Sequence, residues 1–342
     1  MLCTYEFKEL KIEKLKMTKV VVIGLGNMGK HHARNYVRIN GIKLVAVCDL
    51  NKELAVNTAQ KFFCREYSDY KEMLMREEVD AASIAVPTKF HKEVALYCIN
   101  KGINVLVEKP IATTIEDAQE MIAAAKEKGV ILQIGHIERF NPAVKRLKEI
   151  ILDGKLGEVS SIIARRVGAV PIQVRDANVM IDLAVHDIDI INYLYSSSPQ
   201  EIMGNIGKAM IERREDYAET FLKYDGKKSG FIQVNWITPI KIRNLSVTGS
   251  KGYAELDYIT QELIVYESNY TKEIIDEYGD YVVKFGIPNK TYVGIENEEP
   301  LFLELKSFIN CVKTGETPLV TGEIGLETLR IALKVMNGDI NN

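Results

Sequence analysis

The pattern of apolar and polar positions divides the chain into two halves. In the first half, short apolar runs alternate with segments of helical periodicity. The runs lie at residues 18–23, 43–51, 79–88, 103–110 and 130–136. Because these runs are apolar throughout rather than alternating, both faces of the sheet that they form must be covered. The order predicts a doubly wound parallel sheet of the Rossmann type over residues 17–135.

After about residue 150 the expected strands are longer and partly alternating, and turn signals such as YDGKKSG separate them. Alternation is typical of an antiparallel sheet with one packed and one open face. The tail has helical periodicity again. We therefore expect a second α/β domain with a large, mostly antiparallel open sheet and C-terminal helices over residues 136–342. Residues 1–16 are expected to be an N-terminal extension, and Met17 is an alternative start of the chain.

The sequence VVVIGLGNMG places Gly24, Gly26 and Gly29 directly after a strand and at the start of a helix. Gly24 would permit a tight turn, Gly26 would let a pyrophosphate approach the backbone, and Gly29 would let helix and strand pack closely. Asp49 ends the second run, where its carboxylate would accept hydrogen bonds from ribose hydroxyls and repel a 2′-phosphate. The pattern predicts NAD as the cofactor, and a purely structural turn is the alternative.

Other polar groups follow the third and fourth apolar runs. Ligands of doubly wound sheets bind at this carboxyl edge. Lys109 in VLVEKP would therefore point at the nicotinamide and the substrate, with a solvated lysine as the alternative. Thr88 and His91 in AVPTKFH would line the same cleft, or cap and begin a helix. The set expected around the cofactor also includes Asn27, Met28, Pro87, Glu108 and Pro110.

The segment IDLAVHDIDIINYLY, residues 181–195, is typical of an apolar helix, yet it carries ionisable side chains. Asp182, His186 and Asp189 would share one face. Asp182 would hold one ring nitrogen of His186 and leave the other for a general base reaction. A helix-stabilising pair and a metal site are the alternatives, but no HxH or HExxH spacing supports a metal. Asp187, off this face, is expected to be structural or solvated.

Three further residues are candidates for substrate binding beside His186. Arg139 and Asn141 in GHIERFNP would either reach the cleft or fix the crossover between the two halves. Arg175 would bind a phosphate of the substrate.

Composition narrows the class of partner. The net charge of −3 leaves no electrostatic footprint for nucleic acid, so a small metabolite is the expected partner. No apolar run approaches the length needed to span a membrane. The five cysteines are scattered without a CxxC pair, which favours a reducing cytoplasm with free thiols.

Taken together, GLGNMG, Asp49, EKP and DLAVHDID resemble the Gfo/Idh/MocA family of NAD(P)-dependent oxidoreductases over residues 18–338. The resemblance implies a Rossmann domain followed by an α/β domain whose open sheet forms homodimers or homotetramers. It also implies that Lys109 lies by the nicotinamide and the reacting hydroxyl. His186 and Asp182 would take the places of the catalytic histidine and its acidic neighbour. Either Lys109 or His186 could act as the base.

Within the family, GHIERFNPAV followed by MIDLAVHDIDIINYL is similar to nucleotide-sugar enzymes, especially archaeal-type UDP-N-acetylglucosamine 3-dehydrogenases. This implies oxidation of a secondary sugar hydroxyl, most specifically the 3-hydroxyl of UDP-N-acetylglucosamine. An inositol or simple-sugar dehydrogenase is the alternative within the family. A catalytically silent NAD-binding sensor is the alternative of another class, although it should lack the paired EKP and DxxxH motifs. Asp176, Ala177 and Asn178 stand where many members have glycine, so a different substrate pocket is expected.

Overall fold

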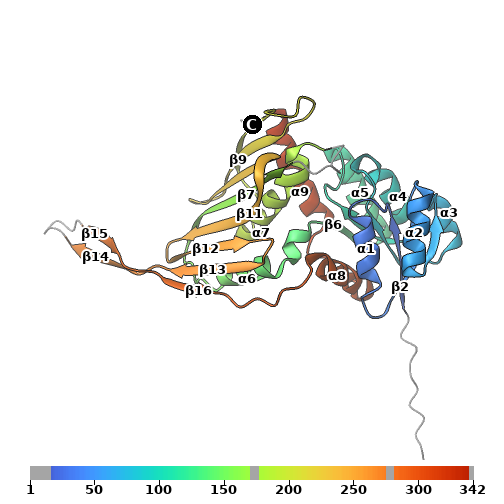
Figure 1. The fold of residues 1–342 in the computed structure, drawn as a ribbon, viewed down its shortest axis with the longest axis horizontal. Helices are drawn as coiled ribbons and strands as arrows, with labels where there is room; N and C mark the ends of the chain where they lie inside the picture. The colour runs from blue at the N-terminus through green and yellow to red at the C-terminus, as the bar shows by residue number, and fades with distance from the viewer. Residues whose placement is uncertain (1–16, 170–176, 275–280, 339–342) are drawn as a thin grey trace, which may run out of the picture.

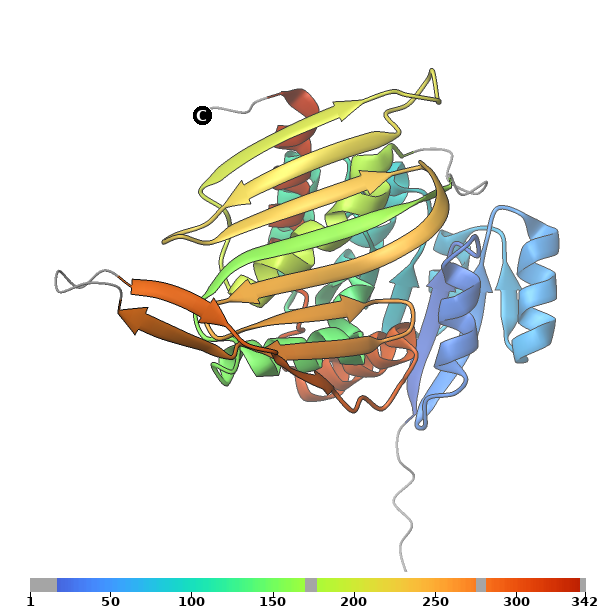
Figure 2. The same ribbon diagram turned by 60° about the vertical axis from the view of Figure 1, so that its left-hand side comes forward.

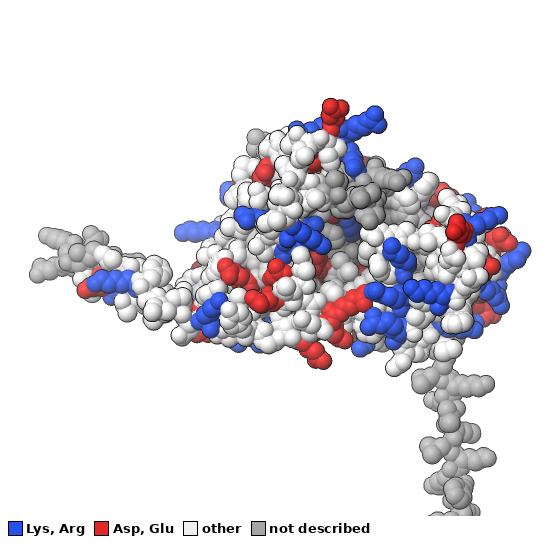
Figure 3. Space-filling view, in the orientation of Figure 1, with Lys and Arg blue, Asp and Glu red and all other residues white. Residues whose placement is uncertain are grey.

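The computed structural model describes residues 17–169, 177–274 and 281–338. The chain forms two α/β parts that lie side by side, one around a six-stranded sheet and one around an eight-stranded sheet (Figures 1 and 2). Within the described ranges, no helix is long and apolar enough to cross a membrane. Basic and acidic side chains are interspersed over the described residues that Figure 3 shows, with no continuous basic stripe on that face.

The six-stranded sheet is parallel throughout, in the order β3-β2-β1-β4-β5-β6. Its strands are β1 (Thr18–Ile23), β2 (Ile42–Cys48), β3 (Arg65–Tyr67), β4 (Ala81–Ile84), β5 (Asn104–Glu108) and β6 (Leu132–Gly135). Its helices are α1 (Gly29–Tyr36), α2 (Lys52–Phe62), α3 (Tyr70–Arg76), α4 (His91–Asn100) and α5 (Ile115–Lys128). The predicted doubly wound sheet is confirmed. The edge strand β3 escapes the sequence pattern because REY contains no apolar run.

Both faces of this sheet are buried, as its apolar strands require. Val21 of β1 joins a core cluster with side chains of α4 and α5, whereas its neighbour Val20 joins the cluster on the opposite face. Helix α8 (Pro300–Thr314) contributes Leu305 and Phe308 to that second cluster. The sequence assigned α8 to the second domain. The structure instead packs it on the first, because its apolar face completes the cover of the parallel sheet.

The eight-stranded sheet has the order β16-β13-β12-β11-β7-β10-β9-β8. Its strands are β7 (Val159–Ala169), β8 (Glu201–Gly207), β9 (Tyr217–Lys223), β10 (Ser229–Asn235), β11 (Ile237–Gly249), β12 (Gly252–Asp257), β13 (Glu262–Glu267) and β16 (Asn289–Tyr292). Neighbouring strands are antiparallel except β7 and β10, which are parallel. This confirms the predicted large and mostly antiparallel sheet.

Helices cover one face of this sheet and leave the other open (Figure 2). They are α6 (Pro142–Leu152), α7 (Val185–Tyr195) and α9 (Gly322–Asn337). Helix α9 contacts both parts, with Leu329 in a core cluster of the first and Ile331 in the core of the second. A separate ribbon of β14 (Tyr270–Ile274) and β15 (Tyr281–Phe285) projects from the body (Figure 1).

Candidate active site

The glycine-rich loop lies between β1 and α1, against the end of β4. Gly24 has a φ of +87°, and a Cβ on it would lie 2.6 Å from the carbonyl oxygen of Ala85. A Cβ on Gly29 would lie 1.8 Å from the carbonyl oxygen of Gly24, so only glycine allows this close approach. At Gly26, by contrast, a Cβ would meet nothing within 4 Å. Open space therefore borders the backbone at the N-terminus of α1, where a pyrophosphate can approach.

Asp49 ties the end of β2 to this loop. Its carboxylate accepts hydrogen bonds from the backbone N–H groups of Leu25 at 2.7 Å and Asn51 at 2.8 Å. The side chain is only partly buried, and a carboxylate has further acceptor positions. Binding of the ribose by Asp49 stays a prediction, to which the structure adds a second role in holding the loop.

The other predicted cofactor contacts lie around the same edge. Asn27 and Pro87 are exposed, and Met28 and Thr88 are half-buried. Thr88 lies in the short 3₁₀-helix η1 (Thr88–Phe90) that follows β4. These four residues are accessible to a ligand, and their contacts with the cofactor stay predictions.

His91 has a different place from the one expected in the cleft. Its side chain is 1% exposed, and its ring nitrogens lie 2.9 Å from the carbonyl oxygens of Val86 and Pro110. Burial lowers the pKa of His91, so the ring is neutral at pH 7 and donates to one carbonyl at a time. The structure supports the helix-start alternative: His91 begins α4 and braces the loops that follow β4 and β5.

Glu108 points away from the cleft and toward α1. Its Oε1 lies 2.9 Å from Nε2 of His32, and its Oε2 accepts a hydrogen bond from the backbone N–H of Lys109 at 3.2 Å. Burial raises the pKa of Glu108, but the hydrogen bond and charge of His32, with Lys109, outweigh it and lower that pKa. His32 was not expected near the site. The one indication in the sequence was that His32 falls on the face of the α1 helix that is expected to be buried. Its contact with Glu108 accounts for a histidine at this position.

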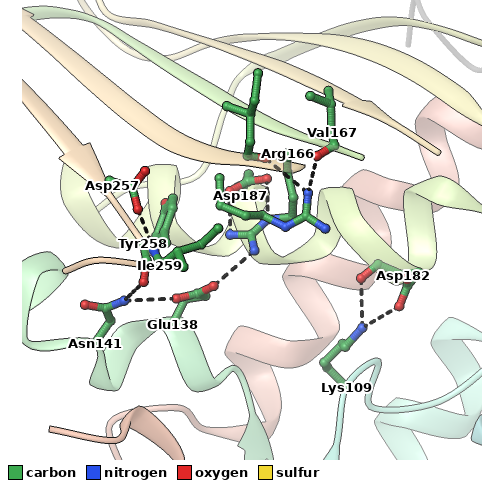
Figure 4. Close-up of polar contacts among 12 residues, drawn as sticks. Lys109, Glu138, Asn141, Arg166, Val167, Asp182, Asp187, Asp257, Tyr258 and Ile259 are labelled. Atoms are coloured by element: carbon green, nitrogen blue, oxygen red, sulfur yellow. Dashed lines mark hydrogen bonds and ion pairs between the residues drawn. The ribbon is translucent and has the colours of Figure 1, made fainter. Parts of the chain in front are cut away.

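Lys109 follows β5 and reaches across to the second part of the molecule. Its ammonium donates to the main-chain carbonyl of Asp182 at 2.8 Å and lies 3.4 Å from the Asp182 carboxylate (Figure 4). The side chains of Lys109 and Asp182 are 16% and 19% exposed. The two predicted residues therefore meet at the boundary between the parts and remain accessible.

Asp182 does not hold His186 as the helical spacing predicted. The expected single helix begins with a π-helical turn, η3 (Met180–Ala184), and only then continues as α7. A π-helical turn has i→i+5 spacing, which shifts the relation between residues four apart. The Asp182 carboxylate contacts Lys109 instead, and the buried Nδ1 of His186 has no hydrogen-bond partner among the described residues.

The surroundings of His186 favour its neutral form. Burial lowers the pKa of His186 well below its ordinary value, and the positive charges of Lys109 and Arg166 lower it further. A neutral imidazole is able to accept a proton. His136 also lies close enough to affect this pKa, although the sequence pattern did not mark it out.

The remaining acidic residues of α7 are fully engaged with arginines. Asp187 accepts two hydrogen bonds from Arg166, at 2.9 and 3.0 Å, and Arg166 also binds Glu138 at 3.0 Å (Figure 4). Asp189 accepts two from Arg139, both at 2.8 Å. Asp187 and Asp189 are both 0% exposed. These are structural ion pairs, and the shared face predicted for Asp189, Asp182 and His186 is wrong because Asp189 points to η2 (Ile137–Phe140).

Arg139 and Asn141 fix the crossover between the two parts rather than reaching the cleft. Asn141 is 1% exposed; it caps α6 through the backbone N–H of Ala143 and donates to the carbonyl of Tyr258 at 3.2 Å. Arg139 is held by Asp189. Neither has a free polar edge for a substrate. Arg175 lies outside the described residues.

Comparison with known proteins places this site in a family. Residues 18–136 match the profile of an oxidoreductase family with an NAD-binding Rossmann fold, and residues 144–255 match the GFO/IDH/MocA C-terminal domain. The chain belongs to the GFO/IDH/MocA oxidoreductase family. The boundary between the two profiles falls where β6 ends.

Relatives in this GFO/IDH/MocA family match almost the whole chain. UDP-N-acetylglucosamine 3-dehydrogenase from Acidithiobacillus ferrooxidans is 28% identical, covering 92% of this chain and 95% of its own. The scyllo-inositol 2-dehydrogenase (NAD(+)) from Bacillus subtilis is also 28% identical, covering 93% of each chain. A solved structure of the Acidithiobacillus enzyme superposes with a TM-score of 0.81 at 25% identity, covering 93% of this chain and 96% of that one.

NAD is the cofactor of this GFO/IDH/MocA chain. The residues present fit it: the backbone is open at Gly26, and the loop that carries it ends at the N-terminus of α1. Gly24 to Gly29 would hold the pyrophosphate, and Asp49 the adenosine ribose. That Lys109, at the end of β5, lies by the nicotinamide stays a prediction.

Proposed function

We propose that this oxidoreductase oxidises a secondary hydroxyl of a sugar or polyol, with the 3-hydroxyl of UDP-N-acetylglucosamine as the specific substrate group. One observation carries the proposal. Lys109, at the carboxyl end of β5, is joined to Asp182 of the second part. The neutral His186 lies close enough for the charge of Lys109 to lower its pKa, and its Nδ1 has no partner among the residues that the structure describes. His186 and Lys109 supply the groups that deprotonation of an alcohol requires, a proton acceptor and a cation.

The division of labour follows from charge. His186 is neutral because it is buried among positive charges, so it can accept the hydroxyl proton. Lys109, held by Asp182, donates a hydrogen bond to the same oxygen as negative charge develops on it. Asp182 acts by positioning Lys109. When bound, NAD supplies the acceptor for the hydride that leaves the carbon, and the product is a ketone.

Two of the relatives support different substrates equally well. The UDP-N-acetylglucosamine enzyme and the inositol enzyme are each 28% identical over more than nine-tenths of the chain. The nucleotide-sugar proposal rests additionally on the resemblance of the GHIERFNPAV segment to nucleotide-sugar enzymes. An inositol or simple-sugar substrate is the second candidate.

A substrate panel tests the proposal. The protein is incubated with NAD and, separately, UDP-N-acetylglucosamine, other UDP-sugars, inositols and free sugars, while NADH absorbance is recorded. Turnover of UDP-N-acetylglucosamine with a kcat/KM at least ten times that of any inositol is expected. The carbonyl position in the product is then assigned by NMR.

Other outcomes of the panel decide between the alternatives. Preferential turnover of an inositol would replace the nucleotide sugar as the substrate. NAD binding without turnover of any compound would instead indicate a binding protein without catalysis.

We also propose that two copies associate through the open face of the eight-stranded sheet. Met203, Phe221, Phe231 and Ile163 lie opposite one another on successive strands. Three of them, Met203, Phe231 and Ile163, are 42%, 38% and 45% exposed. Sedimentation should show a dimer or tetramer, and Phe231→Glu should shift it toward the monomer. If Phe231→Glu has the same oligomeric state as the wild type, the interface lies on another surface.

A further inference from the structure

Two arginines lie opposite one another on neighbouring strands of the larger sheet. Arg166 of β7 is paired in register with Arg243 of β11. Opposed side chains on paired strands point to the same face of a sheet, so both guanidinium groups lie on the helix-covered face. Like charges placed opposite one another destabilise a sheet unless they are compensated.

Only one of the two is compensated within the described part of the chain. Arg166 turns its Nε and Nη2 to Asp187 and its Nη1 to Glu138. Arg243 donates from Nη1 to the carbonyl oxygens of Val167 at 2.9 Å and Ile242 at 3.2 Å. Among residues 17–169, 177–274 and 281–338, no carboxylate pairs with Arg243, and its Nε–Nη2 edge makes no hydrogen bond.

The environment of Arg243 is unfavourable for an isolated cation. The side chain is half-buried. Burial, together with the charge of Arg166, lowers the pKa of Arg243 to about 10. Asp187, Asp182 and Glu138 act on Arg243 through charge alone and only partly oppose this lowering. A half-buried guanidinium that makes no ion pair among the described residues is able to take its counter-ion from a ligand.

Arg243 acts on the residues proposed for catalysis. Its charge contributes to the low pKa of His186, and Asp182 is one of the charges that act on Arg243. His136, which also affects His186, is 2% exposed, and neither of its ring nitrogens has a partner among the described residues. The surroundings of His186 therefore contain polar groups that the described protein leaves unpaired, where such groups are normally satisfied.

We propose that Arg243 binds a phosphate group of the substrate while Lys109 and His186 act on a hydroxyl of the attached sugar. This inference rests on the proposed function and extends it. The Nε–Nη2 edge of a guanidinium matches two phosphate oxygens, just as the same edge of Arg166 matches Asp187. The backbone carbonyls that bind Nη1 hold this edge in place.

The consequence is selection by charge. The hydroxyls of a free sugar or an inositol accept hydrogen bonds but carry no charge, so they leave Arg243 uncompensated. A sugar phosphate or a nucleoside diphosphate sugar supplies both hydrogen-bond acceptors and the counter-charge. The site therefore selects phosphorylated sugars over neutral ones.

Calorimetric binding of UDP to the NAD-loaded protein tests the inference without requiring turnover. Arg243→Gln should weaken UDP binding about 10- to 100-fold, as expected for the loss of charge-assisted hydrogen bonds. Arg243→Lys keeps the charge but loses the two-pronged guanidinium edge, so its affinity for UDP should lie between those of the wild type and Arg243→Gln. Arg146→Gln, on the exposed side of α6, is the matched control and should bind UDP as the wild type does. Inorganic phosphate and N-acetylglucosamine 1-phosphate show whether a phosphate suffices without the nucleoside.

Kinetics supply a second measurement. Because Arg243 is placed on the phosphate rather than the reacting hydroxyl, Arg243→Gln should raise the KM for UDP-N-acetylglucosamine more than it lowers kcat. The KM for a neutral sugar, which has no phosphate, should change less than the KM for UDP-N-acetylglucosamine.

The possible failures are distinguishable. Equal UDP affinity in wild type and Arg243→Gln, with both folded by circular dichroism, overturns the inference. Failure of the wild type to bind UDP, with inositol still oxidised, also overturns it while leaving the oxidoreductase intact. Arg243-dependent UDP binding without any turnover supports the phosphate site and refutes the proposed function.

Discussion

The two sides of the segment 180–195 treat ionisable groups in opposite ways. Toward the sheet and η2, Asp187 and Asp189 are fully buried, and each meets an arginine through two hydrogen bonds of 3.0 Å or less. Toward the first domain, Asp182 meets Lys109 at 3.4 Å, and the Nδ1 of His186 has no hydrogen-bond partner in the part of the chain that the structure describes.

This difference distinguishes polar side chains that stabilise the fold from polar side chains that are able to bind a ligand. Buried charges with complete hydrogen bonding stabilise one arrangement and have no capacity left for a ligand. Groups that are accessible and incompletely paired keep that capacity. The same contrast recurs between Arg166 and Arg243, which occupy paired positions on adjacent strands. Substitutions on the two sides should therefore affect different quantities.

The largest effect is expected from His186→Ala and Lys109→Ala. General acid–base groups contribute about 10²–10⁴-fold, so each variant should lose kcat by that order. At pH 7, NAD affinity and the midpoint of denaturant unfolding should stay near those of the wild type, because neither side chain is fully buried. Lys126→Ala, on the exposed face of α5, serves as the control for Lys109→Ala. If both variants kept a kcat near that of the wild type, His186 and Lys109 would not be catalytic residues.

On the opposite side, Arg166→Met should act on stability. It leaves Asp187 buried and uncompensated, which costs about 3–5 kcal/mol in the free energy of unfolding. The double variant Arg166→Met/Asp187→Leu should recover much of the loss, because it removes the orphaned charge as well. Denaturant unfolding measures both. Arg146→Ala, which breaks the exposed pair with Glu149, should cost about 0.2–1 kcal/mol.

If the single variant Arg166→Met unfolded at the wild-type midpoint, the contrast between the two sides would fail. A double variant no more stable than the single one would indicate that Glu138, the other partner of Arg166, dominates instead.

A smaller effect is expected from Asp182→Asn. The carboxylate is lost, but the main-chain carbonyl of Asp182 still accepts the hydrogen bond from Lys109 at 2.8 Å. The expected fall in kcat is about 10-fold, because positioning is weakened rather than abolished. Stopped-flow or steady-state kinetics against Lys109→Ala provide the comparison. A loss as large as that of Lys109→Ala would mean that the carboxylate takes part in the chemistry itself.

The first domain could be predicted from sequence because its signals are local. Apolar strands, a glycine loop between strand and helix, and Lys109 after β5 all follow from neighbours along the chain. The placement of α8 could not be predicted from the sequence, because an apolar helix face can cover either of the two sheets. Its Leu305 packs with strands that lie far earlier in the sequence.

The sequence predicted which residues form the candidate site, but not which of them contact one another. Lys109, Asp182 and His186 are brought together, yet the expected Asp182–His186 contact is replaced by Asp182–Lys109. Helical spacing assumes regular α-helix, and the π-helical turn of η3 depends on backbone hydrogen bonding that side-chain periodicity does not record. Arg243 was missed for a related reason. Its significance lies in its cross-strand neighbour Arg166 and in the lack of a carboxylate partner within the described ranges, and neither can be read from neighbours along the chain.

The smallest expected effect that distinguishes the two sides of segment 180–195 is on the pH dependence of stability. The pKa of His186 is well below 6.5 in the folded protein and ordinary in the unfolded chain. As pH falls below about 6.5, the unfolded chain therefore binds a proton that the folded protein does not, and stability is lost by about 1.4 kcal/mol per pH unit. Buried His91 and His136 act in the same direction, whereas the raised pKa of Glu304 opposes them. His186→Gln should reduce the wild-type slope by one proton between pH 6.5 and 5, in denaturant unfolding measured across that range. An identical slope in the two proteins would mean that His186 binds its proton alike in the folded and unfolded states, so that the fold does not lower its pKa.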